Sequence, residues 1–181
     1  MSLLWPASWS HRLGVTLASL TFAVGVCGCG PLLATPDPGE LGVALGPRGK
    51  AAGCLIHGLL PDPACTPGAI IATATVSEIC VRGYAHRARD VTPATKWQVY
   101  DAYGIRWHAP RSYEIDHLVP LELGGANSIA NLWPEAAPGY HAKDLVENAL
   151  HEAVCAGRTS LRAAQRQIAR DWRHTQVGPP R

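Results

Sequence analysis

The clearest pattern of apolar and polar residues lies in the second half of the chain. The stretch from Tyr113 to Asn127 predicts a strand that ends in an acid–histidine pair, followed by a Gly-Gly turn at residues 124–125. Residues 131–134 (Asn-Leu-Trp-Pro) predict a second short strand. A helix is expected from about Tyr140 to Val154, with an apolar side formed by Leu145, Leu150 and Val154 and a stop at Gly157.

A final helix is predicted to begin near Ser160. One face carries apolar residues and nearly the opposite face carries arginines; the apolar ones are Leu161, Ala164, Ile168 and Trp172, and the basic ones are Arg162, Arg166, Arg170 and Arg173. We interpret the arginine face as solvated, with contact to phosphates as the alternative. Trp133 and Trp172 are expected in the core.

Two further elements are predicted upstream. The β-branched run from Ile70 to Val76 indicates a strand, which residues 79–81 would continue. Thr92-Pro93 has the residue types of a helix N-cap and first helical position, and Gly104 would end that helix. Its aromatic face, Trp97, Tyr100 and Tyr103, is expected to pack in the core rather than to stack on a ligand.

The front of the chain has the features of an export signal. His11 and Arg12 precede an uncharged run rich in Leu, Val and Ala, which is typical of a secretory signal. Residues 26–29 (Val-Cys-Gly-Cys) resemble a bacterial lipobox with Cys29 as the lipidated residue; ordinary cleavage is the alternative. We therefore predict an exported protein, which is periplasmic, anchored to a membrane through an N-terminal lipid, or secreted. The predicted boundaries are 1–29 signal, 30–53 flexible linker, 54–175 domain and 176–181 disordered tail.

Four cysteines remain after the signal, and an exported protein can keep them as disulfides. Cys54 and Cys65 flank a proline-rich loop and are expected to pair locally. Cys80 and Cys155 would then join the front of the domain to the end of the long helix. A zinc site is less favoured because these cysteines form no C-x-x-C pair. The formal net charge of +2 neither requires nor excludes a polyanionic partner.

Asp116 and His117 are the main candidates for chemistry. Adjacent strand residues point to opposite faces unless the strand ends there, and Pro120 with the Gly-Gly pair suggests an early end. A carboxylate is a good ligand for a hard divalent cation, and a neutral imidazole beside it can deprotonate water. These residues predict a small metal site.

The Asp-His pair, the Gly-Gly loop, the Asn-Leu that follows and the helix beyond it together resemble the HNH (ββα-metal) nuclease motif. The chain is also similar to exported bacterial proteins that carry this motif. That similarity covers about Leu60 to Trp172, through residues 66–69, 113–125, 131–135 and 143–148. The resemblance implies an α+β fold: a small antiparallel sheet with a ββα-metal motif and two to three helices, held by two disulfides.

The resemblance also implies an activity, namely metal-dependent hydrolysis of phosphodiester bonds in DNA or RNA. Asp116 would bind the metal, His117 would activate water, and Asn131 would hold the loop and the imidazole by hydrogen bonds. The cation would be Mg²⁺ first, with Zn²⁺ or Mn²⁺ as alternatives. His141 would be the further metal ligand. Its competitors are Lys143, Glu147, Asn148 and His151, of which the first, second and fourth are spaced to share one helix face.

A second hypothesis from the sequence is a non-catalytic, envelope-associated binding or structural protein that keeps the HNH-like scaffold, because a fold does not fix a function. The modest net charge and the ambiguity of the further metal ligand favour it. The sequence leaves the oligomeric state open.

Overall fold

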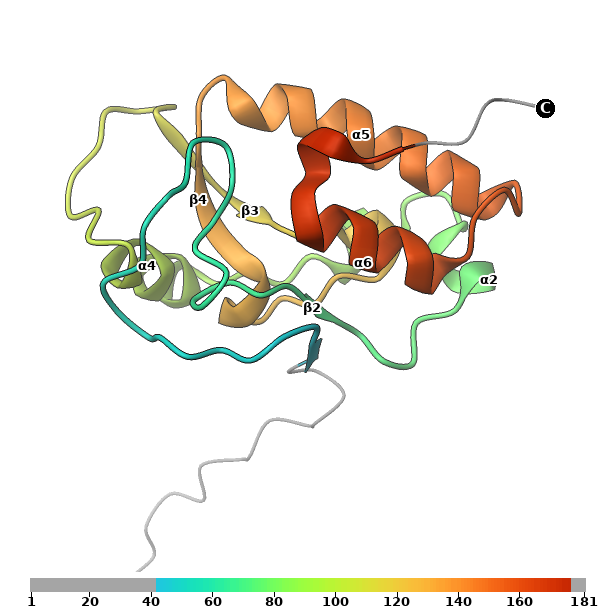
Figure 1. The fold of residues 1–181 in the computed structure, drawn as a ribbon, viewed down its shortest axis with the longest axis horizontal. Coiled ribbons are helices and arrows are strands. Elements are labelled where there is room, and N and C mark those ends of the chain that lie inside the picture. Colours follow the sequence, from blue (N-terminus) through green and yellow to red (C-terminus); the bar gives the residue numbers. More distant parts are fainter. Residues whose placement is uncertain (1–41, 177–181) are drawn as a thin grey trace, which may run out of the picture. The chain divides into compact units, whose positions relative to one another are not determined.

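The computed structural model describes residues 42–176, and Figure 1 shows that they combine short strands with helices. The strands are β1 (Val43–Ala44), β2 (Ala69–Ile70), β3 (Tyr113–His117) and β4 (Leu132–Ala136). The helices are α2 (Val76–Ile79), α3 (Tyr84–Ala88), α4 (Pro93–Ala102), α5 (Gly139–Cys155) and α6 (Leu161–Asp171), with three short 3₁₀ turns at Leu121–Leu123, Ile129–Asn131 and Trp172–His174. The α+β class is confirmed. The described part of the chain has five α-helices where two to three were predicted, and two separate two-stranded sheets.

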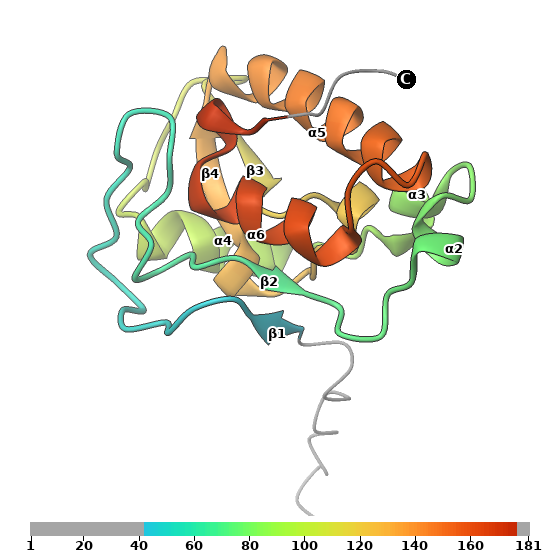
Figure 2. The same cartoon turned by 45° about the vertical axis from the view of Figure 1, so that its right-hand side comes forward.

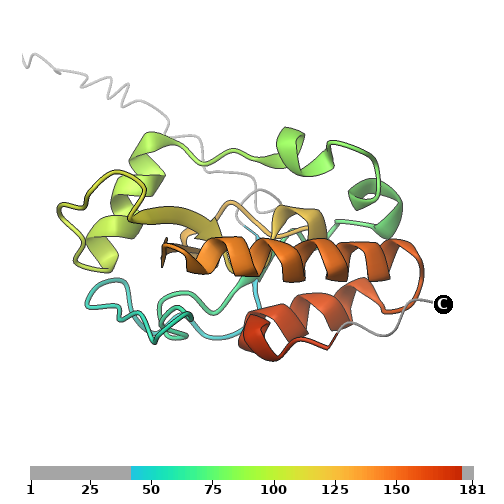
Figure 3. The ribbon, with the colours of Figure 1, turned by 90° about the horizontal axis from the view of Figure 1, so that it is seen from above.

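The β3–β4 pair is antiparallel, and its register decides which side chains share a face. Glu114 lies opposite Glu135, and Asp116 lies opposite Trp133. Directly opposed residues project to the same side of a sheet, so these four side chains share one face. Ile115 and Leu132 project to the other face, where they form a buried cluster with Val99 of α4. Both α4 and α5 contact β4, and Figure 3 shows α5 running beside the pair.

The largest core cluster lies between α5, α6 and the loop that follows β3. Leu150 and Val154 of α5 pack there with Val119 and Leu123 of the loop. The predicted apolar face of α6 is confirmed, because Leu161, Ala164, Ile168 and Trp172 are all buried. The four arginines of the opposite side are all exposed, namely Arg162, Arg166, Arg170 and Arg173. Trp133 is also buried, as expected. Leu145, which was expected on the apolar side of α5, is instead 72% exposed.

The predicted strand over residues 70–76 is wrong in most of its length. Only Ala69 and Ile70 pair, with the Ala44 and Val43 of β1, as Figure 2 shows. Val76 instead begins α2, and residues 79–81 do not continue a sheet. The reason is local: the Thr75 side chain accepts a hydrogen bond from the Glu78 amide, and the Glu78 carboxylate accepts one from the Thr75 amide, which forms a complete capping box. This start signal overrides the β-branched composition of the run.

The described part of the predicted linker, residues 42–53, is integrated with the domain. It contains β1, and Lys50 forms an ion pair with Asp62, with a separation of 3.0 Å from Nζ to Oδ2. The signal, Cys29 and residues 177–181 lie outside the described residues. Within the described ones, no helix is both long and apolar enough to cross a bilayer.

The predicted start of α4 is confirmed. Thr92 is the N-cap, its side chain accepts a hydrogen bond from the Thr95 amide at 3.1 Å, and Pro93 follows at the first position. The predicted core position of Trp97 is wrong, because this side chain is 68% exposed. α4 places its buried side, Val99 and Ala102, on the β3–β4 pair and on the first disulfide, so Trp97 projects away from both.

Two disulfides close the domain, and they join the pairs expected from the sequence. Cys54–Cys65 closes the proline-rich loop and is almost completely buried. Cys80–Cys155 links the end of α2 to the end of α5 across 75 residues of sequence. The second bridge therefore fixes the far end of the helix that packs beside the β3–β4 pair.

Candidate functional site

Asp116 and His117 occupy the end of β3 and contact different partners. The Asp116 side chain turns to α5, where its Oδ2 accepts a hydrogen bond from Lys143 Nζ at 2.6 Å. The His117 ring contacts Asn127 in the β3–β4 loop, with 3.0 Å between Nε2 and Oδ1. The strand continues through His117, so the two side chains follow the usual alternation of a strand. The sequence left open whether the strand would end early enough to bring them together.

The loop between β3 and β4 is organised by Asn131, which is fully buried. Its Oδ1 accepts hydrogen bonds from the Val119 amide at 2.9 Å and the Ala69 amide at 3.2 Å. Its Nδ2 donates to the carbonyls of Val119 at 2.9 Å and Ala126 at 3.0 Å. All four hydrogen bonds go to backbone groups, so Asn131 holds the loop, as the resemblance implies. The imidazole of His117 is held by Asn127 instead.

Three carboxyl groups surround the ammonium group of Lys143, which is 1% exposed. Its Nζ donates to Asp116, to the His117 carbonyl oxygen at 2.7 Å and to Glu147 one turn further along α5. Glu135 of β4 is completely buried, and its carboxyl group is joined to that of Asp116 by a side-chain hydrogen bond. We call Asp116, Glu135, Lys143 and Glu147 the carboxylate–lysine cluster.

The members of this cluster have pKa values that are shifted in different directions. Burial raises the pKa of Glu135 to about 9, and the neighbouring Asp116 carboxylate adds to the effect. Burial also raises the pKa of Glu147 to about 7 despite its lysine partner. For Asp116 burial acts in the same direction, but the charge and hydrogen bond of Lys143 outweigh it and lower its pKa. At neutral pH the cluster therefore holds an ionised Asp116, a neutral Glu135 and a charged Lys143.

The hydrogen bonds of Asn127 assign the tautomer of His117. The Asn127 amide nitrogen donates to the Ala88 carbonyl at 2.7 Å, so its Oδ1 is the group that faces the ring. The ring nitrogen Nε2 then carries the hydrogen, and Nδ1 keeps a lone pair with no partner among the described residues. Burial lowers the pKa of His117 to about 4, so the imidazole is neutral at physiological pH. A neutral ring with an unused lone pair has the electronic state of a proton acceptor.

His141 lies in the first turn of α5 and is exposed. Its ring packs on Tyr140, with 4.4 Å between the ring centroids. Across residues 42–176, one group of three His, Cys, Asp or Glu ligand atoms lies within 4.8 Å of one another, and it is Cys80, His151 and Cys155. Asp116 and His141 are not part of such a group in this conformation. Of the four competitors for the helix position, Lys143 is the one that contacts Asp116, and Glu147 contacts Lys143.

The Cys80–His151–Cys155 group has the donor atoms of a site that could hold a metal ion. His151 Nε2 lies 3.4 Å from Cys155 Sγ and 3.1 Å from the Ile79 carbonyl oxygen. The two sulfurs are joined as a disulfide in the structure, however, and a metal needs thiolates. The group is therefore a potential metal site of the reduced protein, and the structure does not identify a metal.

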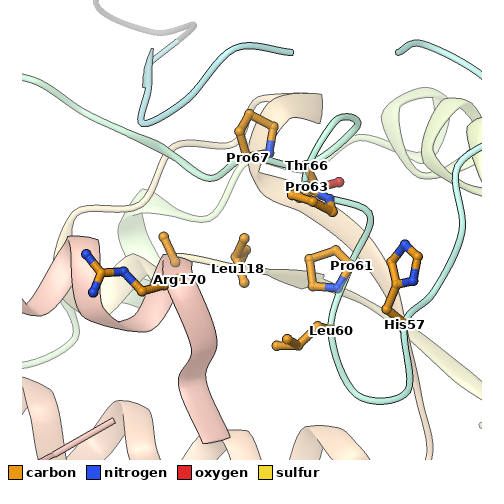
Figure 4. Close-up of a pocket in the computed structure, with 9 residues that line it drawn as sticks. His57, Leu60, Pro61, Pro63, Thr66, Pro67, Leu118 and Arg170 are labelled. Atoms are coloured by element: carbon orange, nitrogen blue, oxygen red, sulfur yellow. The ribbon is translucent and has the colours of Figure 1, made fainter. Parts of the chain in front are cut away.

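A cavity of about 380 Å³ lies between the first disulfide loop and α6 (Figure 4). Figure 4 shows Leu118, the residue after His117, between prolines of the first disulfide loop on one side and Arg170 of α6 on the other. The lining is mainly apolar and comprises His57, Leu60, Pro61, Pro63, Thr66, Pro67, Leu118, Ala169 and Arg170. Neither Asp116 nor His117 contributes to it, so this cavity is separate from the candidate site.

The sequence interpretation missed Glu135 and Asn127 as members of the site. Both had a usable signal. Glu135 is two residues beyond Trp133, so a strand with Trp133 buried also buries Glu135. Asn127 lies two residues after the Gly-Gly turn, where an amide can bridge loop and strand. The position of Lys143 between carboxylates required the helix to pack on the strand and had no local signal.

Comparison with known proteins does not assign this arrangement to a family. No protein-family model matches the chain, and neither a curated protein nor a solved structure does. The function therefore has to be argued from the site itself.

Proposed function

We propose that this protein is an exported HNH-like nuclease in which His117 accepts a proton from the water that attacks a phosphodiester bond of DNA or RNA. The observation that carries the proposal is the order of elements around the acid–histidine pair. β3 ends on Asp116 and His117, β4 pairs with it antiparallel, and α5 follows and packs beside β4. Two strands and a helix in this order are what the sequence resemblance implies.

The state of His117 supports the assigned role. The ring is neutral, its Nε2 is oriented by Asn127, and Nδ1 retains its lone pair. General-base catalysis needs such an oriented, unprotonated acceptor. The ring is also 1% exposed, so the proposal requires an opening that lets water and a phosphate approach Nδ1.

The divalent cation that the resemblance implies does not fit the ligand residues in this conformation. Asp116 already accepts a hydrogen bond from the buried Lys143 ammonium, and the exposed His141 is not grouped with it. A cation at Asp116 would have to displace Lys143. We therefore assign no step of the hydrolysis to a metal, and dependence on Mg²⁺, Mn²⁺ or Zn²⁺ remains part of the test.

The test is nicking of supercoiled plasmid, and cleavage of single-stranded DNA and RNA, with each metal and with a chelator. We expect the wild type to cleave, and His117→Ala to lose about 10²- to 10⁴-fold in rate, which is the usual contribution of a general base. His57→Ala, an exposed histidine outside the site, is the matched control and should retain the rate. His141→Ala tests the predicted metal ligand. A folded wild type that is inert under every condition would exclude the nuclease proposal.

The second candidate is a non-catalytic, envelope-associated binding or structural protein, and the carboxylate–lysine cluster favours it. A buried lysine that neutralises Asp116 performs by itself the charge compensation that a cation would provide. This candidate predicts a folded, inert protein whose stability falls when Lys143 is replaced by Met. Both candidates include export, and the two disulfides are typical of an oxidising compartment. Lipid attachment at Cys29 and membrane association remain predictions.

A further inference from the structure

The surface formed by α4 and the loop after it exposes large aromatic side chains. Trp97 on α4 is 68% exposed and Trp107 in the loop is 84% exposed, whereas Trp133 and Trp172 are buried. Extensive exposure of such large apolar side chains is uncommon and marks surfaces that bind something. We call Trp97, Tyr100, Ile105, Arg106 and Trp107 the α4 aromatic surface.

Ring contacts connect this surface to the candidate site. The centroids of Trp97 and Tyr100 are 6.4 Å apart, those of Tyr100 and His108 are 4.8 Å apart, and those of His108 and Tyr113 are 5.7 Å apart. Tyr113 is the first residue of β3, and the same strand ends on Asp116 and His117. In Figure 1, α4 and the loop that leads into β3 lie at the same end of the β3–β4 pair. The row of rings therefore leads along the chain toward the acid–histidine pair.

A shallow cavity of about 240 Å³ lies within the surface, lined by Trp97, Tyr100, Asp101, Ile105 and Arg106. Its chemistry combines aromatic walls with one carboxylate acceptor and one guanidinium. Lys96 and Arg111 add positive charge at the ends of the same segment, and Asp101 is the single acidic residue between them. The surface thus offers flat rings for stacking and the Arg106 guanidinium for a phosphate.

We propose that the α4 aromatic surface binds single-stranded nucleic acid, with bases stacked on Trp97 and Trp107 and a phosphate paired to Arg106. Stacking on exposed rings is available only to unpaired bases, because bases in a duplex already stack on one another. Asp101 would accept hydrogen bonds from the amino groups of a base in the cavity. The inference rests on the proposed function in one respect: the bound single-stranded nucleic acid would be the substrate of the nuclease, held beside β3.

A protein partner is the main alternative for exposed tryptophans, and the residue types favour nucleic acid over it. Protein interfaces have a contiguous apolar centre, whereas Ile105 is the one aliphatic side chain lining this cavity. Tryptophans interspersed with arginines are instead the combination that single-strand binders use, because they serve the base and the phosphate separately.

The experiment is fluorescence anisotropy with labelled mixed-sequence oligonucleotides of about 15 nucleotides, as single-stranded DNA, RNA and duplex DNA. The full-length protein is used with chelator over a series of low salt concentrations, and gel electrophoresis of the oligonucleotides after each titration checks that they are intact. We expect single strands to bind more tightly than duplex. Trp97→Ala and Trp107→Ala should each weaken binding by about fivefold or more. Arg106→Gln should weaken it and lower the salt dependence by about one phosphate contact.

Leu145→Ala is the matched control, since Leu145 is an exposed apolar residue on α5, outside the surface. It should bind as the wild type does. Equal binding by all variants, preference for duplex, or no binding by the folded wild type would overturn the proposal, as would a protein partner whose binding depends on Trp107. Anisotropy of His117→Ala separates this proposal from the nuclease one, because that variant should bind normally even if no cleavage is ever observed.

Discussion

Asn131, Glu135 and Lys143 are polar side chains that the fold buries almost completely. Their environments differ. Asn131 has four backbone hydrogen bonds, and Lys143 has two carboxylates and a carbonyl, while Glu135 faces the carboxylate of Asp116. Burying a second negative charge beside that carboxylate would cost free energy, so Glu135 holds its proton and donates it to Asp116 in a hydrogen bond. Glu135 is therefore the residue through which pH should act on stability.

Replacing Glu135 by Gln should make the protein more stable at alkaline pH. The folded pKa of Glu135 is raised from 4.5 to about 9, so the folded state holds a proton that the unfolded chain releases. The stability contributed by this group is complete below pH 4.5 and is lost as the pH rises toward 9. Urea unfolding should give equal free energies of unfolding for wild type and Glu135→Gln below pH 4.5, and an advantage for the variant that grows by up to about 1.4 kcal/mol per pH unit between pH 5 and pH 8.

Glu152→Gln serves as the control for that measurement, because Glu152 is an exposed carboxylate on α5. Its effect should stay within about 0.5 kcal/mol across the pH range. His117 also affects the free energy of unfolding at low pH. Because its pKa is lowered in the folded state, the stability that it contributes is present above pH 6.5 and is lost as the pH falls toward 4. This contribution is common to both proteins and cancels in the difference. A Glu135→Gln variant with no pH-dependent advantage would contradict the buried, neutral carboxyl.

At the scale of elements, the loop between β3 and β4 decides how the acid–histidine pair is presented. Gly124 has a left-handed backbone, with φ of +69°, and the Gly125 amide donates to the Pro120 carbonyl at 2.9 Å. A Cβ at Gly125 would stand 1.8 Å from the Val119 carbonyl oxygen. The loop therefore closes on itself so tightly that its second glycine leaves no room for a side chain.

Substituting Ala for Gly125 should consequently disrupt this loop. The Val119 carbonyl that would be displaced also accepts from Asn131, so the clash would reach the hydrogen bonds that hold the loop. We expect a loss of about 3 kcal/mol or more in free energy of unfolding, measured by urea unfolding with circular dichroism. Gly49→Ala is the control, because a Cβ there meets nothing within 4 Å. Equal stability of the two variants would show that the loop can be rebuilt around a side chain.

For the whole molecule, the two disulfides differ in position and in accessibility. Cys54 and Cys65 are 3% and 2% exposed, whereas Cys155 is exposed and Cys80 lines a cavity of about 400 Å³ together with His151. The buried bridge closes a short loop, and the accessible one closes a loop across 75 residues. Cys80–Cys155 is thus both the bridge that a reductant reaches first and the bridge that closes the longer loop.

Mild reduction should open Cys80–Cys155 before Cys54–Cys65. Alkylation followed by mass spectrometry should detect modified Cys155 while Cys54 and Cys65 remain unmodified. The double variant Cys80→Ser, Cys155→Ser should lower the free energy of unfolding by about 4 kcal/mol on the chain-entropy model. Simultaneous modification of all four cysteines in protein that is still folded would contradict this order.

The sequence by itself determined the elements whose signals are local: the N-caps of α4 and α6, the strand ending in Asp116 and His117, the long helix after it and both cysteine pairings. Residue types within one or two turns of each other suffice for the elements, and the Cys80–Cys155 pairing, across 75 residues, follows once Cys54 and Cys65 pair locally. The sequence misassigned residues 71–76 and Trp97, where composition favoured a strand or a core position and capping or packing decided otherwise.

Only the tertiary structure decided the composition of the site. Lys143 reaches Asp116 because α5 packs on the face of β3 and β4 that carries the carboxylates, and His117 meets Asn127 because the loop folds back. These contacts join residues 27 and 10 positions apart. Their free energy depends on burial and on the neighbouring charges, which are properties of the packed molecule, and no periodic pattern along the chain encodes them.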